Sequence, residues 1–138
     1  MSAPRRRSIQ PEKLHRRVID GHVLYSHVVT VDGGRLVFVS GQLARDQAGN
    51  IVGRGDMGAQ IRQVGENLKT ALEAAGAALS DLVKTTTFVT DIDAFFKCVD
   101  VRMEYFGPAI PTSTTVEVRR LAHPDLMVEV EAIAVIAS

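Results

Sequence analysis

The sequence of 138 residues contains one cysteine, Cys98, and therefore no disulfide framework and no CxxC pair. A chain that folds without disulfides is typical of a reducing compartment, and we expect this protein in the cytoplasm. No apolar run reaches the roughly 18 residues of a membrane-spanning helix, so the sequence predicts no membrane partner. The basic first residues lead into no apolar run, and we expect no secretory signal.

Motifs for several common chemistries are absent as well. The chain has no GxGxxG, no P-loop and no GxSxG pattern, the usual signatures of dinucleotide-binding proteins, nucleoside triphosphatases and serine hydrolases. Its four histidines show no HxxxH or HExxH spacing, and Cys98 has no ligand beside it. The sequence therefore predicts no metal site.

The net charge of zero hides an uneven distribution of charged residues. Residues 1–17 hold six Lys or Arg and one Glu, whereas the remainder holds ten basic and fifteen acidic residues. We interpret residues 1–17 as a basic, flexible N-terminal arm and residues 18–138 as one domain. A basic arm can bind nucleic acid, but no aromatic residue is interleaved with these arginines to stack on bases. Nucleic acid is therefore not favoured as a partner.

Hydrophobic periodicity and turn residues predict seven elements. Five strands are expected at residues 23–31, 35–39, 83–89, 112–120 and 127–136, and two helices at residues 57–75 and 91–106. Asp32-Gly33-Gly34 is a turn signal of the hairpin kind between the first two strands. The order β-β-α-β-α-β-β predicts a single α+β domain whose two helices cover one face of a mixed sheet. The other face carries many apolar and small residues, which favours oligomerisation.

Three groups of polar residues are candidates for binding or chemistry. Ser40 and Gly41 directly follow a hydrophobic strand, where a glycine lets a ligand approach the backbone. Glu129 lies on a partly apolar strand face, where a carboxylate can hold a water or orient an amine. Ser113 and Thr115 share one face of the preceding strand. Each pattern also fits an ordinary strand end, a solvated strand edge or the β-propensity of threonine.

Further segments follow one another in a specific order along the chain. They are Tyr25-Ser26, LVFVSGQ at 36–42, GNIV at 49–52, QIRQVGENLKTALEAAG at 60–76, VKTTTFV at 83–89, YFG at 105–107, PTSTTVEV at 111–118 and VEVEAIA at 128–134. In this order they resemble the Rid (reactive intermediate deaminase, YjgF-type) family, over roughly residues 22–137. The resemblance implies a chorismate-mutase-like fold and a homotrimer whose sheets line an inner barrel, with clefts at the subunit boundaries.

The resemblance also implies a chemistry. The family's studied deaminases hydrolyse small enamines and imines, such as 2-aminoacrylate, to 2-oxo acids and ammonia, and they need no metal or organic cofactor. In this chain Glu129 matches the glutamate that helps the attacking water. Tyr25, Ser40 and Thr115 match pocket positions, and we expect them to bind the substrate together with Gly41 and Ser113.

One position departs from the family pattern. Where the family has an arginine that clamps the substrate carboxylate through two parallel hydrogen bonds, this chain has Ser113. Arg119 lies six residues further along the strand, about 20 Å away in an extended chain, and cannot replace that arginine within the subunit. Arg102 and Arg45 are the other candidates.

The sequence leaves two functions open. The first is a hydrolytic deaminase, or a related hydrolase, that acts on a small enamine or imine at a subunit-interface cleft. The alternative is a trimer that binds a small metabolite without catalysis. Glu129 favours the enzyme and Ser113 favours the binding protein. A third function, ribonuclease or translation inhibitor, is supported only by the basic arm.

Overall fold

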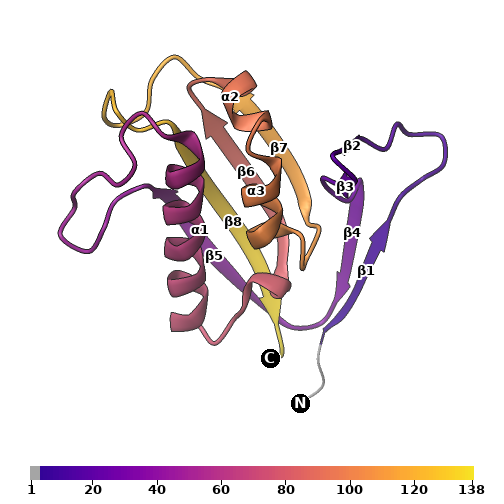
Figure 1. Cartoon of the computed structure of the whole chain (residues 1–138). Coiled ribbons are helices and arrows are strands. Elements are labelled where there is room, and N and C mark those ends of the chain that lie inside the picture. The colour runs from indigo at the N-terminus through magenta and orange to yellow at the C-terminus, as the bar shows by residue number, and fades with distance from the viewer. Residues whose placement is uncertain (1–3) are drawn as a thin grey trace.

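The computed structural model describes residues 4–138 and confirms the expected α+β fold. Across these residues Figure 1 shows three α-helices in front of a four-stranded sheet, with a two-stranded ribbon at its side. The elements in chain order are β1 (Arg5–Ile9), β2 (Val18–Ile19), β3 (His22–Val23), β4 (Val28–Asp32), β5 (Arg35–Leu43), α1 (Met57–Ala74), the 3₁₀ turn η1 (Leu79–Asp81), β6 (Leu82–Val89), α2 (Ile92–Phe96), α3 (Val99–Phe106), β7 (Thr112–Glu117) and β8 (Val128–Ile136).

The four-stranded sheet has the strand order β5-β8-β6-β7. β8 runs antiparallel to both β5 and β6, while β7 runs parallel to β6. The helices α2 and α3 join β6 to β7 and provide the crossover that a parallel pair requires. β8 takes the remaining side of β6, and most of its residues are buried, which suits a central strand.

The hairpin that the turn signal indicated between the first two strands is wrong. The Gly33-Gly34 turn joins β4 to β5, but the two strands form no hairpin, because β4 pairs with β1 and β5 pairs with β8. The last two strands are not neighbours either, since β6 lies between β7 and β8. β5 also continues past its expected end at Val39 to Leu43. A local turn signal identifies a change of direction, but the partner strand is chosen by burial across the whole sheet.

The basic segment contains a strand that the charge pattern did not indicate. β1 pairs antiparallel with β4. Arg6 turns toward the body of the fold, where its Nη2 donates to the carbonyls of Leu82 and Ala109 at 3.2 and 2.5 Å. Residues 5–9 are thus an ordered strand and not a flexible arm, because the backbone groups of β4 form hydrogen bonds with those of β1. The first three residues of the expected arm lie outside the described residues.

The longest helix, α1, forms where the apolar period predicts it. The buried members of its apolar stripe are Met57, Ile61, Val64, Leu68 and Leu72. Asp56 caps its N-terminus by accepting a hydrogen bond from the Ala59 N–H at 3.0 Å, and Gly76, at a φ of +76°, follows its C-terminus. Gly65 faces Tyr105 of α3, and a Cβ there would collide with the ring. α1 and α3 therefore pack closely.

The second expected helix is divided into α2 and α3, with the break at Cys98. Phe95 of α2 belongs to the main core, as do Tyr105 and Phe106 of α3. Val99 and Met103 of α3 pack with Leu24 in a second, smaller cluster. No helix within residues 4–138 has both the length and the apolar character needed to cross a bilayer.

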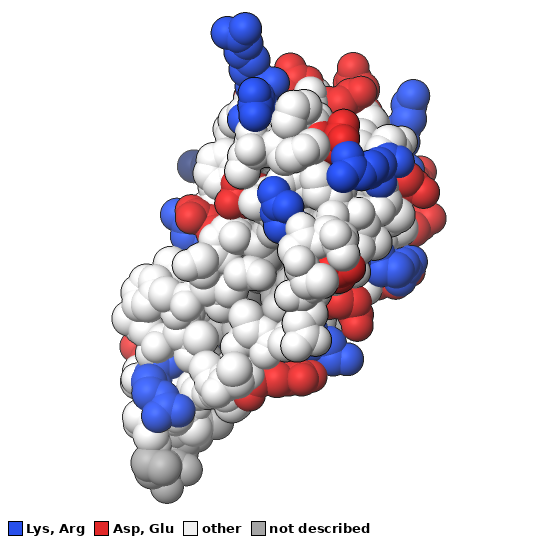
Figure 2. All heavy atoms as spheres, turned by 90° about the vertical axis from the view of Figure 1, so that its left-hand side faces the viewer, with Lys and Arg blue, Asp and Glu red and all other residues white. Residues whose placement is uncertain are grey.

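The sheet has one face covered by helices and one open face. Val39 and Val130 are buried on the covered face, whereas Leu36 and Phe38 on the open face are 60% and 71% exposed. Figure 2 looks from the side of α1 and β5, and its lower part is largely uncharged, below an area where charges of both signs mix. An exposed apolar sheet face of this kind is typical of a surface that contacts another molecule.

Candidate functional site

Tyr25 is held next to the start of β7 by its neighbour Ser26. The Ser26 side chain is buried; its Oγ donates to the Ile110 carbonyl at 2.5 Å, and its backbone N–H donates to the Pro111 carbonyl at 3.1 Å. These bonds join the segment before β4 to the residues that lead into Ser113. Tyr25 and Ser113, which are far apart in the sequence, therefore line the same cavities.

Ile110 has an unusual backbone conformation directly before β7. Its φ is +44°, in the left-handed region, where a β-branched residue is strained by about 1–3 kcal/mol. The turn is held by two hydrogen bonds: the Ile110 N–H donates to the Phe106 carbonyl at 2.8 Å, and its carbonyl accepts from Ser26. Strained backbone of this kind clusters at ligand-binding sites.

One cavity beside this turn, which we call the arginine pocket, has a volume of about 180 Å³. Its lining residues are Arg17, Leu24, Tyr25, Ile92, Phe96, Arg102, Ser113 and Thr115. Ser113 and Thr115 reach it from the helix-covered face of β7, where they pair with the buried Thr85 and Thr87 of β6. The pocket thus brings together three residues that the sequence analysis expected to bind substrate, Tyr25 among them.

The Arg102 side chain connects α3 with β7. Its Nη2 donates to Ser113 Oγ at 3.3 Å, and its guanidinium carbon lies 5.4 Å from the centre of the Phe95 ring. Only 5% of the residue is exposed. Burial, with a smaller contribution from the positive charge of Arg17, lowers the pKa of Arg102 to about 10. The guanidinium therefore stays protonated at neutral pH.

The remaining expected residues lie where β5 and β8 meet, and we call Ser40, Gly41 and Glu129 the carboxylate patch. The register of β5 on β8 shifts between Val39 and Gln42, so that Ser40 and Gly41 form a bulge. The Glu129 side chain lies against Gly41, where any Cβ would collide with its carboxylate. The glycine is therefore required for the position of Glu129.

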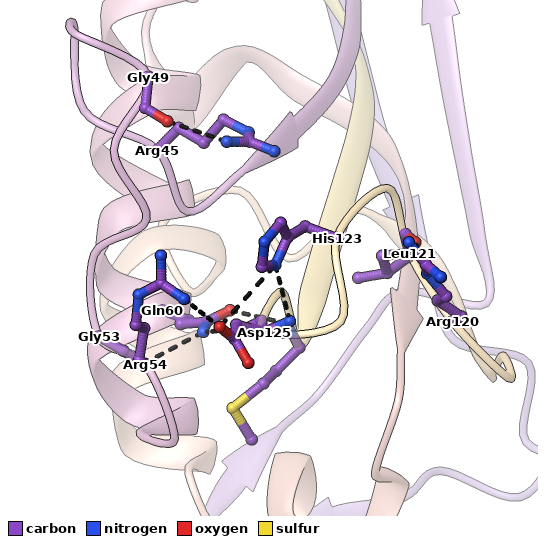
Figure 3. A network of polar contacts seen from close by, with 10 residues as sticks. Arg45, Gly49, Gly53, Arg54, Gln60, Arg120, Leu121, His123 and Asp125 are labelled. Carbon is purple, nitrogen blue, oxygen red and sulfur yellow. Dashed lines mark hydrogen bonds and ion pairs between the residues drawn. The ribbon is translucent and has the colours of Figure 1, made fainter.

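A buried amide on α1 fixes the start of β8 (Figure 3). Gln60 is completely buried, and its Nε2 donates to the carbonyls of Gly53 and Asp125 at 3.1 and 2.8 Å. Its Oε1 accepts from the Met127 N–H at 2.8 Å. These bonds hold the loop two residues before Glu129, so that the direction of the carboxylate depends on the contact of α1 with this loop.

The arginine pocket and the carboxylate patch lie on opposite sides of the sheet. Residues paired across neighbouring strands point to the same face, and Thr115 pairs with Thr87, which pairs with the buried Val130. Glu129 is adjacent to Val130 in β8, and because successive strand residues point to opposite faces, its side chain points to the open face. Within one chain, the sheet therefore separates the expected catalytic carboxylate from the expected binding residues of β7.

Two further arginines are placed by the structure. Arg17, which the charge pattern assigned to the basic arm, lies with its guanidinium carbon 4.3 Å from the centre of the Phe96 ring, in the arginine pocket. No sequence signal separates Arg17 from its basic neighbours, because only the tertiary fold places it there. Arg45 stays in the loop after β5, where its Nη1 donates to the Gly49 carbonyl at 2.9 Å (Figure 3). Within residues 4–138 no three His, Cys, Asp or Glu side chains are grouped to hold a metal ion.

Comparison with known proteins points to one family. The profile of the endoribonuclease L-PSP family matches residues 17–136. The chain is 42% identical over 113 residues to the 2-iminobutanoate/2-iminopropanoate deaminase of Salmonella typhimurium, with 79% of this chain and 86% of that protein covered. It is 44% identical over 111 residues to a RutC family protein of Pyrococcus abyssi, with 80% and 84% covered. The solved structure of the Rid family protein YyfB from Yersinia pestis matches with a TM-score of 0.81 at 33% identity, over 94% of this chain and 98% of that one.

The fold is thus an α+β sheet-and-helix domain of the chorismate-mutase-like kind. The chain belongs to the Rid family, whose sequence profile carries the name endoribonuclease L-PSP. The family membership expected from the sequence is confirmed. Position 113 of this chain is a serine, which offers a ligand a hydroxyl group and no positive charge.

Proposed function

We propose that this protein is a hydrolytic deaminase that acts on a small imine or enamine in a cleft between two copies of the chain. The observation that carries the proposal is the division of the candidate residues into two groups. Glu129 and Gly41 lie on the open sheet face, while Tyr25 and Thr115 line the arginine pocket on the other side. A second copy packed against the first can bring one group from each chain together.

The open sheet face offers a surface for such packing. Leu36, Phe38 and Val116 are exposed apolar side chains of β5 and β7. A hollow of about 270 Å³ lies beside Phe38 on this face and is also lined by Lys84 and Ile133. We propose that three copies pack with these sheet faces toward the centre, as the family resemblance implies, which would remove the apolar side chains from water.

In the proposed reaction, the Glu129 carboxylate accepts a proton from the water that attacks the imine carbon. Protonated Glu129 then passes this proton to the nitrogen of the tetrahedral intermediate. The new hydroxyl group gives up its proton to the nitrogen as the carbonyl forms, the carbon–nitrogen bond breaks and ammonia leaves. The hydroxyl groups of Tyr25 and Thr115 and the backbone at Ser40-Gly41 orient the imine. Water is the only co-reactant, and the products are a carbonyl compound and ammonia.

Glu129→Gln tests this chemistry, because glutamine keeps the shape of the side chain and removes its basicity. We expect imine hydrolysis to fall by on the order of 10²–10⁴-fold while the fold is kept. Glu131→Gln is the matched control, since Glu131 lies two residues along on the same face and should leave turnover unchanged. The assay is the release of 2-oxo acid from an imine generated by an amino-acid oxidase, with semicarbazide as a trap. Unchanged turnover in Glu129→Gln would contradict the proposal.

A non-catalytic trimer that binds a small metabolite is the alternative, and Ser113 is the residue that favours it. In that case the wild-type protein would bind 2-oxo acids but hydrolyse no imine. Ribonuclease activity has little support, because Arg6 is occupied by backbone carbonyls. RNA binding that weakens with salt and is lost in an Arg5→Gln/Arg7→Gln variant would be needed to favour it.

A further inference from the structure

Arg102 is a buried cation that has no carboxylate partner among the described residues. Two exposed arginines of the chain form ion pairs with acidic side chains, but within residues 4–138 neither Arg102 nor Arg17 does so. A charge that is removed from water without a partner is costly, and natural proteins keep such groups where a ligand supplies the partner. A ligand with a negative charge would supply the missing partner here.

The remaining donors of Arg102 have access to the arginine pocket. A guanidinium carries five N–H donors, and the one hydrogen bond of the Arg102 side chain goes to Ser113 Oγ. Among the described residues no side-chain nitrogen or oxygen is both fully buried and without a partner. The other nitrogens of Arg102 therefore keep contact with open space, and the pocket that Arg102 lines provides it.

The walls of the pocket restrict the kind of anion. Leu24, Ile92 and Phe96 are apolar, while Tyr25 and Thr115 add hydroxyl groups. The volume of about 180 Å³ is below the roughly 300–1,000 Å³ that drug-sized ligands occupy, so the ligand is a small metabolite. A second positive charge comes from the neighbouring arginine on the Phe96 ring. Together these features fit a small carboxylate with a short apolar side chain.

We propose that Arg102 binds the carboxylate of the substrate and that Ser113 positions its guanidinium, so that the clamp comes from α3 instead of β7. The substrate is then a small 2-imino acid with an apolar side chain, and this part of the inference rests on the proposed deaminase function. A planar guanidinium matches a carboxylate through two parallel hydrogen bonds. Ser113 Oγ accepts from Nη2 and leaves the other nitrogens free for this contact.

Calorimetric binding of 2-oxobutanoate and of 2-butanone tests the clamp without any catalysis, because the two differ in the carboxylate. We expect Arg102→Gln to raise the Kd of 2-oxobutanoate by on the order of 10²-fold and to leave the binding of 2-butanone unchanged. Arg102→Lys should lose part of the affinity, since an ammonium cannot form the parallel pair. Arg120→Gln, at an exposed arginine away from the pocket, is the control and should bind like the wild type.

Moving the charge by one side chain provides a rescue. The double variant Arg102→Gln/Ser113→Arg places a guanidinium back in the same pocket. We expect its Kd for 2-oxobutanoate to lie within about tenfold of the wild-type Kd. Ser113→Ala should weaken 2-oxobutanoate binding several-fold, and Ser113→Thr, which keeps the hydroxyl, should restore it. In the deaminase assay Arg102→Gln should raise the KM for imines of apolar amino acids more than it lowers kcat, as expected for a binding residue.

The outcomes separate this inference from the proposed function. If the wild type hydrolyses imines and the folded Arg102→Gln protein does so with the same KM, the deaminase function is supported and the carboxylate-binding role of Arg102 is contradicted. If 2-oxobutanoate binding depends on Arg102 but the wild type hydrolyses no imine, the carboxylate-binding role of Arg102 is supported and the deaminase function is contradicted. Failure of the wild type to bind 2-oxobutanoate or other small apolar 2-oxo acids would overturn the clamp. Should Arg102→Gln fail to fold, Arg102→Lys and the double variant give the same comparison.

Discussion

The two sides of the sheet are built by different means and carry opposite charges. The arginine pocket gathers side chains from four separate stretches of the chain and holds two cations, Arg17 and Arg102. The residues of the carboxylate patch come from two adjacent strands, and the patch carries the acidic group. If the two groups met within one chain, an ion pair between Arg102 and Glu129 would neutralise both. The sheet keeps them apart, so each stays free for a ligand.

Each side also has its own buried hydrogen-bonding residue. Ser26 ties the pocket together through the Ile110 carbonyl, and Gln60 ties the loop before β8 to α1. Neither residue lines the pocket or the patch, and each acts on one side of the sheet only. This independence makes the comparison testable, because a change on one side should alter either ligand binding or turnover, but not both equally.

Mixing two inactive variants should give the largest effect. At substrate concentrations far below the KM, we expect Glu129→Gln and Arg102→Gln chains to be nearly inactive alone, and to recover roughly a quarter of wild-type imine hydrolysis when refolded together as random trimers. The reason is that every mixed trimer contains one cleft in which the Arg102→Gln chain contributes Glu129 and the Glu129→Gln chain contributes Arg102. Light scattering should give about three times the chain mass throughout. A mixture that stays as inactive as its parents would place both halves of the site in one chain.

Gly41→Ala should break the carboxylate patch alone. The added Cβ collides with the Glu129 carboxylate, so we expect kcat for imine hydrolysis to fall by about 10–100-fold, while the Kd of 2-oxobutanoate changes little. Gly58→Ala is the matched control, because a Cβ at this position of α1 meets its nearest atom, Asp56 Oδ1, only at 3.6 Å. Full turnover in Gly41→Ala would show that the position of Glu129 does not matter.

Gln60→Leu should destabilise the protein and affect the same side. The change leaves the Met127 N–H and two carbonyls without their partner, and we expect the free energy of unfolding to fall by roughly 2–4 kcal/mol in urea denaturation. Because the start of β8 loosens, kcat should fall while 2-oxobutanoate binding is kept. Equal losses of binding and turnover would mean that the two sides are not independent.

Ser26→Ala should have the smallest effect and act on the other side. Loss of the hydrogen bond to the strained Ile110 turn should cost about 1–3 kcal/mol of unfolding free energy. We expect weaker binding of 2-oxobutanoate and a kcat close to that of the wild type. Ser80→Ala, at an exposed serine of η1, is the control and should alter neither quantity. A selective loss of kcat in Ser26→Ala would reverse the assignment of the two sides.

Several features could be read from the sequence because they depend on local periodicity. The apolar period of α1 and its cap at Asp56 gave the helix, and the alternation along β8 put Glu129 on a different face from Val130. The Gly33-Gly34 turn gave a change of direction. The division of the second helix at Cys98 was not predicted, because residues 91–106 contain no Pro or Gly that would mark a break. The strand in the basic segment was missed because its arginines lack apolar alternation.

The sequence by itself determined the family, the α+β class and the face of its own strand on which each candidate side chain lies. Only the tertiary structure decided that Ser113 and Glu129 lie on opposite sides of one sheet, since the parity of a strand says nothing about its neighbours. It also decided that Arg102 points inward at Ser113, although an arginine in a helix is usually exposed. The physical reason is that strand order and helix direction are set by the burial of apolar area over the whole chain. That burial depends on contacts between distant segments and cannot be read from any one of them.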